Sequence, residues 1–403
     1  MPRRNYFLIL CSAGLSLLCY QASDHNPLGR SFSEVADLVE RRYVGKVDRS
    51  ALWTGAVRGM LGELGDPYSI YIAPKEAADF EEMLSQEFAG IGIQLDPRSS
   101  PLTVLSPIVG SPAYRAGILA GDVIAKIDGH SARGMKYADA ASRIRGKPGE
   151  TVQLTMLRPG KTEPIDFPPI AREIINIDSV LGDTHDSHDQ WNFLLQKNPA
   201  IGYLRIVNFG ERTVVELQTA LEKLRAQAMQ GLVLDLRNNP GGLLPAARGV
   251  CDLLIAEGKP IVSTRGRDRQ VLDNYVAGGG QKFLDFPIAV LLNEGSASAS
   301  EIVAACLQDN DRAVVIGQRS YGKGTVQHVI PLHANLGVLK LTTADYWRPS
   351  GHNIQRKADA KDADEWGVSP NSGMEVKLSE GEAQKWMIWR RDRDVVRPHE
   401  NAA

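Results

Sequence analysis

A serine in a turn of small residues is the strongest candidate for chemistry in this sequence. Ser298 lies between Asn293 and Glu301, and only Gly, Ser and Ala occupy positions 295–300. Small neighbours let a substrate backbone approach a nucleophilic hydroxyl, and amides at a helix start can stabilise a developing oxyanion. The same spacing, with Glu301 three residues after Ser298, is also typical of a capping box. Spacing alone favours this second interpretation.

A serine nucleophile needs a base, and Lys323 is the residue that could supply one. It lies between Gly322 and Gly324, and burial would favour the uncharged amine that can accept a proton. A strand beginning at this lysine would place Gln327 on the same face, where it could hold the amine. The alternatives are a solvated lysine and a surface glutamine. No motif brings any of the eight histidines to Ser298: His25, His130, His185, His188, His328, His333, His352 and His399.

Backbone amides that could bind an oxyanion are expected in a second loop. Asn239, Pro240, Gly241 and Gly242 follow an apolar run that predicts a buried strand. An exposed glycine amide here could act beside the amide of Ala299, at the start of the next helix. The alternative is a plain loop with glycines at a helix start.

The elements around these residues predict an α/β region from about residue 170 onward. Apolar runs at 231–236, 287–292 and 313–316 are typical of buried strands, whereas 243–255 and 298–307 are typical of helices. Strands that alternate with helices favour a largely parallel sheet. Both candidate loops follow strands, and functional sites collect at the carboxyl ends of strands in such sheets.

Other regions flank this one. Apolar residues spaced by three and four predict helices between about 30 and 86, and short strands with glycine turns follow to about 171. The segment 182–190 is polar and contains His185 and His188, but its spacing favours a solvated loop over a metal site. The tail from Lys377 is charged and is expected to form an exposed, partly helical extension.

The composition excludes several classes of function. Lys plus Arg is 46 and Asp plus Glu is 48, so the net charge of −2 argues against binding nucleic acid. With 403 residues, 43% hydrophobic, the chain has the composition of a multidomain globular protein. It contains no CxxC or HExxH motif, so no metal site is indicated. Cys251 and Cys306 lie in predicted helices and are expected to be buried thiols.

The amino end predicts export. Arg3 and Arg4 precede an uncharged, largely apolar stretch from Tyr6 to Tyr20, which is typical of a signal peptide. The stretch is long for a signal and shorter than the roughly 20 residues of a spanning helix. Two interpretations therefore remain open, a periplasmic protein and one attached to the inner membrane by an uncleaved anchor.

Several motifs together resemble the carboxyl-terminal processing peptidases, also called tail-specific proteases. They are GLVLDLRNNPGGLL at 231–244, GSASASEI at 295–302 and YGKGTVQ at 321–327. The earlier segments GIGI, SPAYRAGILAGDVIAKIDG and IRGKPGE resemble the PDZ domain that this family carries. The resemblance covers roughly residues 32–376. It implies an α/β fold with a crotonase- or ClpP-like protease core, an inserted PDZ domain and an N-terminal helical arm.

The resemblance also assigns roles to residues. It implies that Ser298 is the nucleophile, Lys323 the general base and Gln327 the residue that orients the lysine, which reverses the preference for a simple cap. The implied oxyanion hole consists of the amides of Ala299 and Gly241, with Gly242 as the close alternative. The PDZ loop that receives a substrate carboxylate corresponds to Gly90, Ile91, Gly92 and Ile93. The sequence departs from the family between Gln355 and Trp366, where an insertion rich in Lys and Asp occurs.

The implied domains are a signal or anchor (1–22), a helical region (23–86), the PDZ domain (87–168), the protease core (169–376) and the charged extension (377–403). The implied activity is a serine endopeptidase that cleaves proteins near apolar carboxyl-terminal tails, without a cofactor, metal or nucleic acid. An adaptor protein and self-association through the N-terminal helices are further expectations. Two alternatives remain, a non-catalytic PDZ scaffold on the same core and a tricorn-like peptidase with a histidine base.

Overall fold

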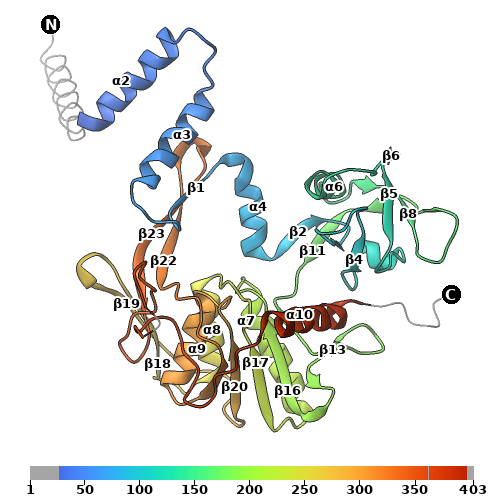
Figure 1. Cartoon of the computed structure of the whole chain (residues 1–403), viewed down its shortest axis with the longest axis vertical. Helices are drawn as coiled ribbons and strands as arrows, with labels where there is room; N and C mark the ends of the chain where they lie inside the picture. The colour runs from blue at the N-terminus through green and yellow to red at the C-terminus, as the bar shows by residue number, and fades with distance from the viewer. Residues whose placement is uncertain (1–26, 362, 397–403) are drawn as a thin grey trace, which may run out of the picture. The chain divides into compact units, whose positions relative to one another are not determined.

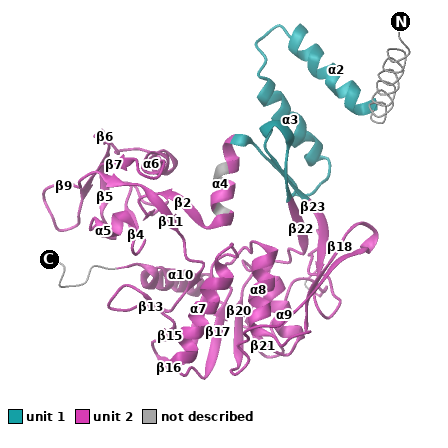
Figure 2. Cartoon of the chain, turned by 180° about the vertical axis from the view of Figure 1, so that it is seen from behind, with its two compact units in different colours: residues 1–74, 329–341 teal, residues 75–328, 342–403 magenta. Residues whose placement is uncertain are grey.

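The computed structural model describes residues 27–361 and 363–396, which form two compact units (Figure 2). Residues up to 74 belong to the first unit together with 329–341, and the remainder belong to the second. The expected signal or anchor at residues 1–22 lies outside the described residues. Every helix in the described ranges is too short or too polar to cross a bilayer.

Helices dominate the first unit, as the sequence predicts. α2 spans Pro27–Arg42 and α3 spans Arg49–Gly62. Asp48 caps α3 because its carboxylate accepts hydrogen bonds from two amides of the first turn. β1 (Ile70–Ile72) pairs antiparallel with the first residues of β23 (Val338–Trp347). α2 has no buried residue, and its apolar residues Leu28, Phe32, Val35 and Leu38 are exposed.

The region that resembles a PDZ domain consists of short antiparallel strands and two helices. β5 (Val123–Ile127) pairs with β8 (Leu154–Leu157), and α6 (Tyr137–Ile144) buries Ala140 and Ile144 in the same core. Apolar residues of alternate strand positions fill that core, as period-two patterning requires. The other elements here, with the helix α4 that precedes them, are α4 Pro74–Ser85, β2 Glu87–Gly90, β3 Ile93–Leu95, β4 Val104–Pro107, α5 Pro112–Arg115, β6 His130–Ser131, β7 Thr151–Val152, β9 Ile165–Asp166, β10 Ile170–Ala171 and β11 Glu173–Asn176.

A largely parallel sheet forms the centre of the α/β core, which is the expected protease core (Figure 1). Four strands in the order β16 (Asn198–Ile206), β17 (Gly231–Asp235), β20 (Ile288–Leu292) and β21 (Ala313–Gly317) run parallel. β12 (Val180–Leu181) adds to the β16 edge in the antiparallel sense. The parallel arrangement that the alternating pattern predicts is confirmed.

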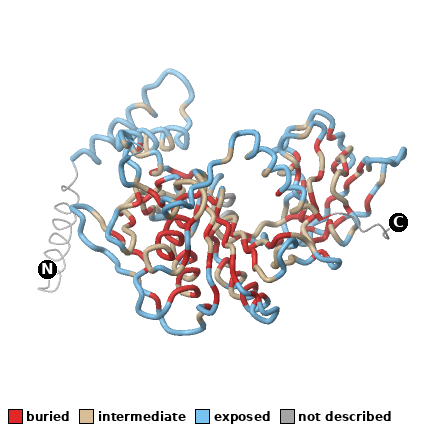
Figure 3. The backbone as a smooth tube through the Cα atoms, turned by 60° about the horizontal axis from the view of Figure 1, so that its bottom comes forward, coloured by how far each residue is buried: buried red, intermediate tan, exposed pale blue. Residues whose placement is uncertain are grey.

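Three helices pack around this sheet: α7 (Thr213–Ala226), α8 (Leu244–Leu254) and α9 (Ala299–Asp309). α9 is buried at every position from 299 to 307, which is typical of a helix enclosed on all sides. Figure 3 shows buried residues concentrated in the strands and helices of this core. Cys251 and Cys306 are buried, free thiols, as expected.

A second antiparallel sheet flanks the core. β18 (Pro260–Arg265) pairs with β19 (Val271–Val276) and with the last residues of β23, and β22 (Thr325–Pro331) also pairs with β23. β22 begins at Thr325, so the strand expected from Lys323 starts later and the lysine itself lies in a turn.

The charged tail forms α10 (Glu380–Asp394), whose residues are mostly exposed, in agreement with the expected exposed and partly helical extension. Arg390 is an exception, since it is buried and its guanidinium donates to the Asp183 carbonyl at 2.6 Å. One expectation for a polar segment requires correction. The segment 182–190 is not a solvated loop. It belongs to a hairpin of β13 (Thr184–His185) and β14 (Trp191–Asn192), followed by β15 (Leu194–Leu195). The His185 and Trp191 rings stack at 3.9 Å, so ring packing stabilises the hairpin.

Candidate active site

Ser298 lies in a strained turn between β20 and α9. Its backbone has φ 54° and ψ −112°. Ordinary cap residues are extended, as at Asp48 and Ser379, the caps of α3 and α10, where φ is −94° and −64°. A positive φ at a non-glycine residue costs about 1–3 kcal/mol and is concentrated at functional sites. A sharp strand-to-helix turn that exposes a serine is also the geometry of a nucleophile elbow. Ser298 and Glu301 also form the capping box that their spacing predicts, so Ser298 does cap α9, and only its positive φ sets it apart from the other two caps.

The loop after β17 holds this elbow in place. The carbonyl of Asn239 accepts hydrogen bonds from the Ala297 amide at 2.9 Å and from the Ser300 hydroxyl at 3.0 Å. The Asn239 side chain is buried and donates to the carbonyl of Ile206 at 2.8 Å. A Cβ at Gly241 would lie 2.8 Å from the Cβ of Ser298, so only glycine permits this approach. The two candidate loops therefore form one structure.

Glu301 joins the serine turn to the lysine turn. Its side chain is fully buried, and one carboxylate oxygen accepts from the Ser298 amide at 2.7 Å and the Lys323 amide at 2.9 Å. The other oxygen accepts from the Ser320 hydroxyl at 2.6 Å and the Gly322 amide at 2.7 Å. Because two amides contact one oxygen, the backbones of Ser298 and Lys323 must lie close together.

The electrostatic state of Glu301 follows from its surroundings. Burial raises the pKa of this carboxyl to about 7, against the opposing effect of the hydrogen bonds from Ser320, Gly322, Ser298 and Lys323. From the sequence, Glu301 is expected only as part of a capping box, and its wider role is not recognised. A charged residue in an otherwise apolar helix start is the signal that could have revealed it.

Gln327 lies on the strand that follows the lysine turn. Thr325 and Gln327 are half-buried on one face of β22, with buried Val326 on the other. The Gln327 amide nitrogen donates to the hydroxyls of Thr325 at 2.8 Å and Thr342 at 3.2 Å. These bonds fix the orientation of the side chain next to the turn that carries Lys323.

The candidate oxyanion donors differ in whether their amides already donate a hydrogen bond within the protein. The amide of Gly241 donates to the Asn239 side-chain oxygen at 2.8 Å, so binding an oxyanion would displace that bond. Ala299 is the first residue of α9, and the first amides of a helix have no acceptor within the helix. Gly242 has φ 148°, and a Cβ there would lie 2.1 Å from the carbonyl oxygen of Phe209. Both glycines are therefore required by backbone packing.

The predicted carboxylate-binding loop of the PDZ domain lines a groove. The carbonyls of Ile91 and Gly92 accept hydrogen bonds from inside the domain, from the amides of Ala113 and Ile108 at 2.9 Å each. Gly92 has φ 77°, a conformation that favours glycine. The groove has a volume of about 350 Å³ between this loop and α6, and its lining includes Gly90, Ile91, Gly92, Ile93, Tyr137, Ala141 and Ile144.

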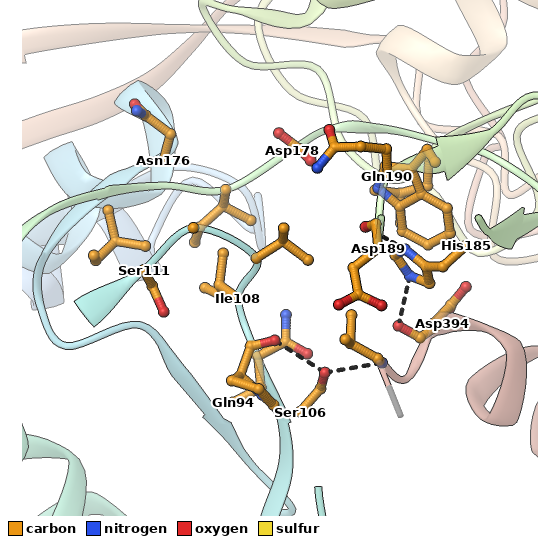
Figure 4. Close-up of a pocket in the computed structure, with 18 of the residues that line it drawn as sticks. Gln94, Ser106, Ile108, Ser111, Asn176, Asp178, His185, Asp189, Gln190 and Asp394 are labelled. Atoms are coloured by element: carbon orange, nitrogen blue, oxygen red, sulfur yellow. Dashed lines mark hydrogen bonds between the residues drawn. The ribbon is translucent and has the colours of Figure 1, made fainter. Parts of the chain in front are cut away.

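A larger polar cavity, of about 570 Å³, has neither Ser298 nor Lys323 in its lining. Figure 4 shows residues that line it. Its lining includes Gln94 and Ser106 of the PDZ domain, and Asp189 of the β13–β14 hairpin. The Tyr114 hydroxyl donates to the Asp189 carboxylate at 2.5 Å. Burial, followed by the nearby Glu216 carboxylate, raises the pKa of Asp178 in this cavity. The described residues contain no cluster of side chains able to hold a metal ion.

A parallel α/β core with a serine elbow, joined to a PDZ domain, defines a class of peptidases. The profile of peptidase family S41 matches residues 200–372, that of the PDZ domain matches 89–167, and that of the "Activating protease CtpB N-terminal domain" matches 21–76. The chain belongs to peptidase family S41, among the carboxyl-terminal processing proteases. The expected fold class, with an α/β core, a PDZ domain and N-terminal helices, is confirmed.

Individual relatives support this assignment. The carboxy-terminal-processing protease of Bartonella bacilliformis is 42% identical over 328 residues, which cover 80% of this chain and 72% of the relative. The carboxy-terminal processing protease CtpA of Bacillus subtilis is 35% identical over 319 residues, covering 79% and 65%. A solved structure from Bacteroides fragilis, assigned to the S41 proteases, has a TM-score of 0.50 at 18% identity over 79% of this chain and 82% of that one. This last similarity supports the fold alone.

Proposed function

We propose that this chain is a serine endopeptidase in which Ser298 is the nucleophile and Lys323 is the general base. The observation that carries the proposal is the shared carboxylate oxygen of Glu301, which the amides of both residues contact at 2.7 and 2.9 Å. The positive φ of Ser298 adds the elbow geometry that a nucleophile requires. Membership of family S41 supports peptide bonds as the substrate.

The proposed reaction proceeds through an acyl-enzyme. Neutral Lys323 removes the hydroxyl proton of Ser298 as the oxygen attacks a peptide carbonyl, while Gln327 orients the lysine. The amide of Ala299 and that of Gly241 or Gly242 stabilise the oxyanion, typically by about 3 kcal/mol per donor. The tetrahedral intermediate collapses, the protonated lysine donates to the leaving amine, and an acyl-enzyme remains. Water, deprotonated by Lys323, then hydrolyses the ester.

The PDZ domain supplies the substrate preference in this proposal. An extended apolar tail would pair with β3 and place its terminal carboxylate at the Gly90–Ile93 loop. The groove between this loop and α6 supports that role. Substrates would be proteins with apolar carboxyl-terminal tails, delivered directly or by an adaptor protein. Export to the periplasm, with or without membrane attachment, belongs to the same proposal.

Self-association through the N-terminal helices is a further part of the proposal. In the first unit, α2 exposes Phe32, Val35 and Leu38, with 45–58% of each side chain accessible. Apolar side chains at this spacing commonly mark a helix that packs against a partner. Sedimentation of the wild type and of a Phe32→Glu, Val35→Glu variant would test this, because a mass unchanged by the variant would contradict it.

Variants of the dyad test the main proposal. Ser298→Ala and Lys323→Ala should each abolish cleavage of a reporter with an apolar tail while circular dichroism and Tm remain those of the wild type. Lys385→Ala, an exposed lysine of α10, is the matched control and should retain full activity. Turnover retained by either dyad variant would overturn the mechanism. A wild type that binds tails without cleaving them would favour the scaffold alternative, and loss on mutating one histidine would favour the tricorn-like one.

A further inference from the structure

A second set of hydrogen bonds, separate from those of Glu301, holds the turn that carries Lys323. The Arg356 amide donates to the carbonyl of Gly322 at 2.8 Å, and the Gly324 amide donates to the Gln355 side-chain oxygen at 2.9 Å. Both glycines that flank the lysine are therefore bonded to one segment of chain. That segment, Gln355 and Arg356, lies at the start of the insertion noted in the sequence.

Trp366, at the far end of the insertion, packs against the same turn. Gly322 has φ 86°, and a Cβ there would lie 2.8 Å from Cε3 of Trp366 and 2.7 Å from Cβ of Arg356. The ring therefore contacts the residue immediately before Lys323, with no space between them for a larger side chain.

Two guanidinium groups hold the indole ring. The Cζ atoms of Arg319 and Arg356 lie 4.6 and 4.5 Å from its centroid, within the range of a cation–π interaction. Arg319 is anchored in turn, because it donates to the Ser369 hydroxyl at 3.0 Å and to the Asp364 carbonyl at 3.2 Å. Cation–π contacts on a half-buried ring fix its position more firmly than packing alone.

The indole nitrogen takes no part in this arrangement. Nε1 of Trp366 is buried and has no hydrogen-bond partner in the structure as described. The ring is therefore used for its face and its size, and a phenyl ring could replace it without loss of a hydrogen bond. A Trp366→Phe variant can therefore test the packing role of the ring without removing a hydrogen bond.

We propose that Trp366 is a positioning residue for the catalytic lysine, acting through Gly322, with Arg319 and Arg356 holding its ring. This inference rests on the proposed Ser298–Lys323 dyad. Since the lysine acts in the chemical step, displacing its turn lowers kcat and leaves KM largely unchanged.

The test measures kcat and KM for Trp366→Ala and Trp366→Phe on the apolar-tailed reporter, with rates expressed per active site titrated by a fluorophosphonate. Trp366→Ala should lower kcat per titrated site by about tenfold or more, because displacements of about 1 Å at a catalytic group cost up to about 100-fold. KM should change by less than about threefold, and Trp366→Phe should recover most of the rate. Trp389→Ala is the matched control, since this exposed tryptophan of α10 stacks on Arg393 away from the turn, and it should match the wild type.

A purely structural role predicts a different result. Trp366→Ala would then lower Tm or the fraction of titratable sites, while kcat per site would remain that of the wild type, and this outcome would overturn the inference. Failure of Trp366→Phe to recover activity would also overturn it. A failure of the dyad itself would be distinct, because Lys323→Ala would then retain turnover or the fluorophosphonate would label Ser298→Ala as well as the wild type.

Discussion

Two buried carboxyl groups of the protease core are held by opposite kinds of partner. Glu301, beside the dyad, accepts from the Ser320 hydroxyl and from backbone amides, all of them neutral groups. Asp183, beside α10, accepts from the Gln196 amide at 3.0 Å, but it also faces two guanidinium groups, that of Arg393 at 2.7 Å and that of Arg390 at 3.6 Å. The Glu301 carboxyl holds the backbones of two turns together, and the Asp183 carboxyl holds α10 against the core.

The difference shows that a buried carboxyl can hold two turns together without a charged partner. The hydrogen bonds from neutral donors fix the orientation of the Glu301 carboxyl. They do not fully offset the cost of burying its charged form, so its pKa rises to about 7. The arginines beside Asp183 carry a full positive charge, which holds α10 in place. An arginine in the same role beside Lys323 would add a permanent positive charge there. The first arrangement is the one found at Ser298 and Lys323, where we propose that the lysine is neutral.

The largest effect is expected from removing Glu301, the carboxyl that is held by neutral donors. Glu301→Ala leaves the Ser320 hydroxyl and the amides of Ser298, Gly322 and Lys323 without their acceptor. Each unsatisfied buried group costs about 1–3 kcal/mol, so the turns should separate and kcat should fall by about 100-fold or more. Reporter cleavage and the urea midpoint measure this. Activity within a few-fold of the wild type would show that Glu301 does not position the dyad.

A pH titration of stability sharpens the comparison. The pKa of Glu301 is raised to about 7 from 4.5, so the folded state binds its proton more tightly than the unfolded chain. That stabilisation is complete below about pH 4.5 and is lost as pH rises through about 7. Relative to Glu301→Gln, which cannot ionise, the wild type should lose up to about 3 kcal/mol between pH 5 and 8. Urea unfolding at each pH measures it, and parallel curves for the two proteins would contradict the assignment.

The charged corner should respond more weakly and without loss of catalysis. In Arg390→Ala, Asp183 keeps its bond from Arg393 at 2.7 Å and Asp394 keeps its bond from Arg205 at 2.6 Å. The expected loss is about 1–3 kcal/mol of unfolding free energy, because partners remain for both carboxylates. The exposed neighbour Arg391 provides the control, and its alanine variant should unfold like the wild type. A fall in kcat as large as that of Glu301→Ala would break the distinction between the corners.

Sequence patterns predict the elements well because local periodicity determines them. The strands of the parallel sheet and the loops after β17 and β20 follow from apolar runs and turn residues, and they place Ser298 and Gly241 against each other. The bonds from Glu301 to 320–323 could not be predicted, because they depend on tertiary contacts between distant segments. The same reason explains the hairpin at 184–192, where stacking of Trp191 on His185 overrides a polar sequence.

The left-handed backbone at Ser298 has a practical consequence. Glycine adopts φ near 54° without the steric penalty that any other residue carries there. Replacing Ser298, the proposed nucleophile, with glycine would remove the steric strain of the turn, whereas alanine would keep that strain and lose only the hydroxyl. The Ser298→Gly protein, which we expect to be inactive, should therefore have a higher free energy of unfolding than the wild type. It would then be the better variant for isolating bound protein tails from cells.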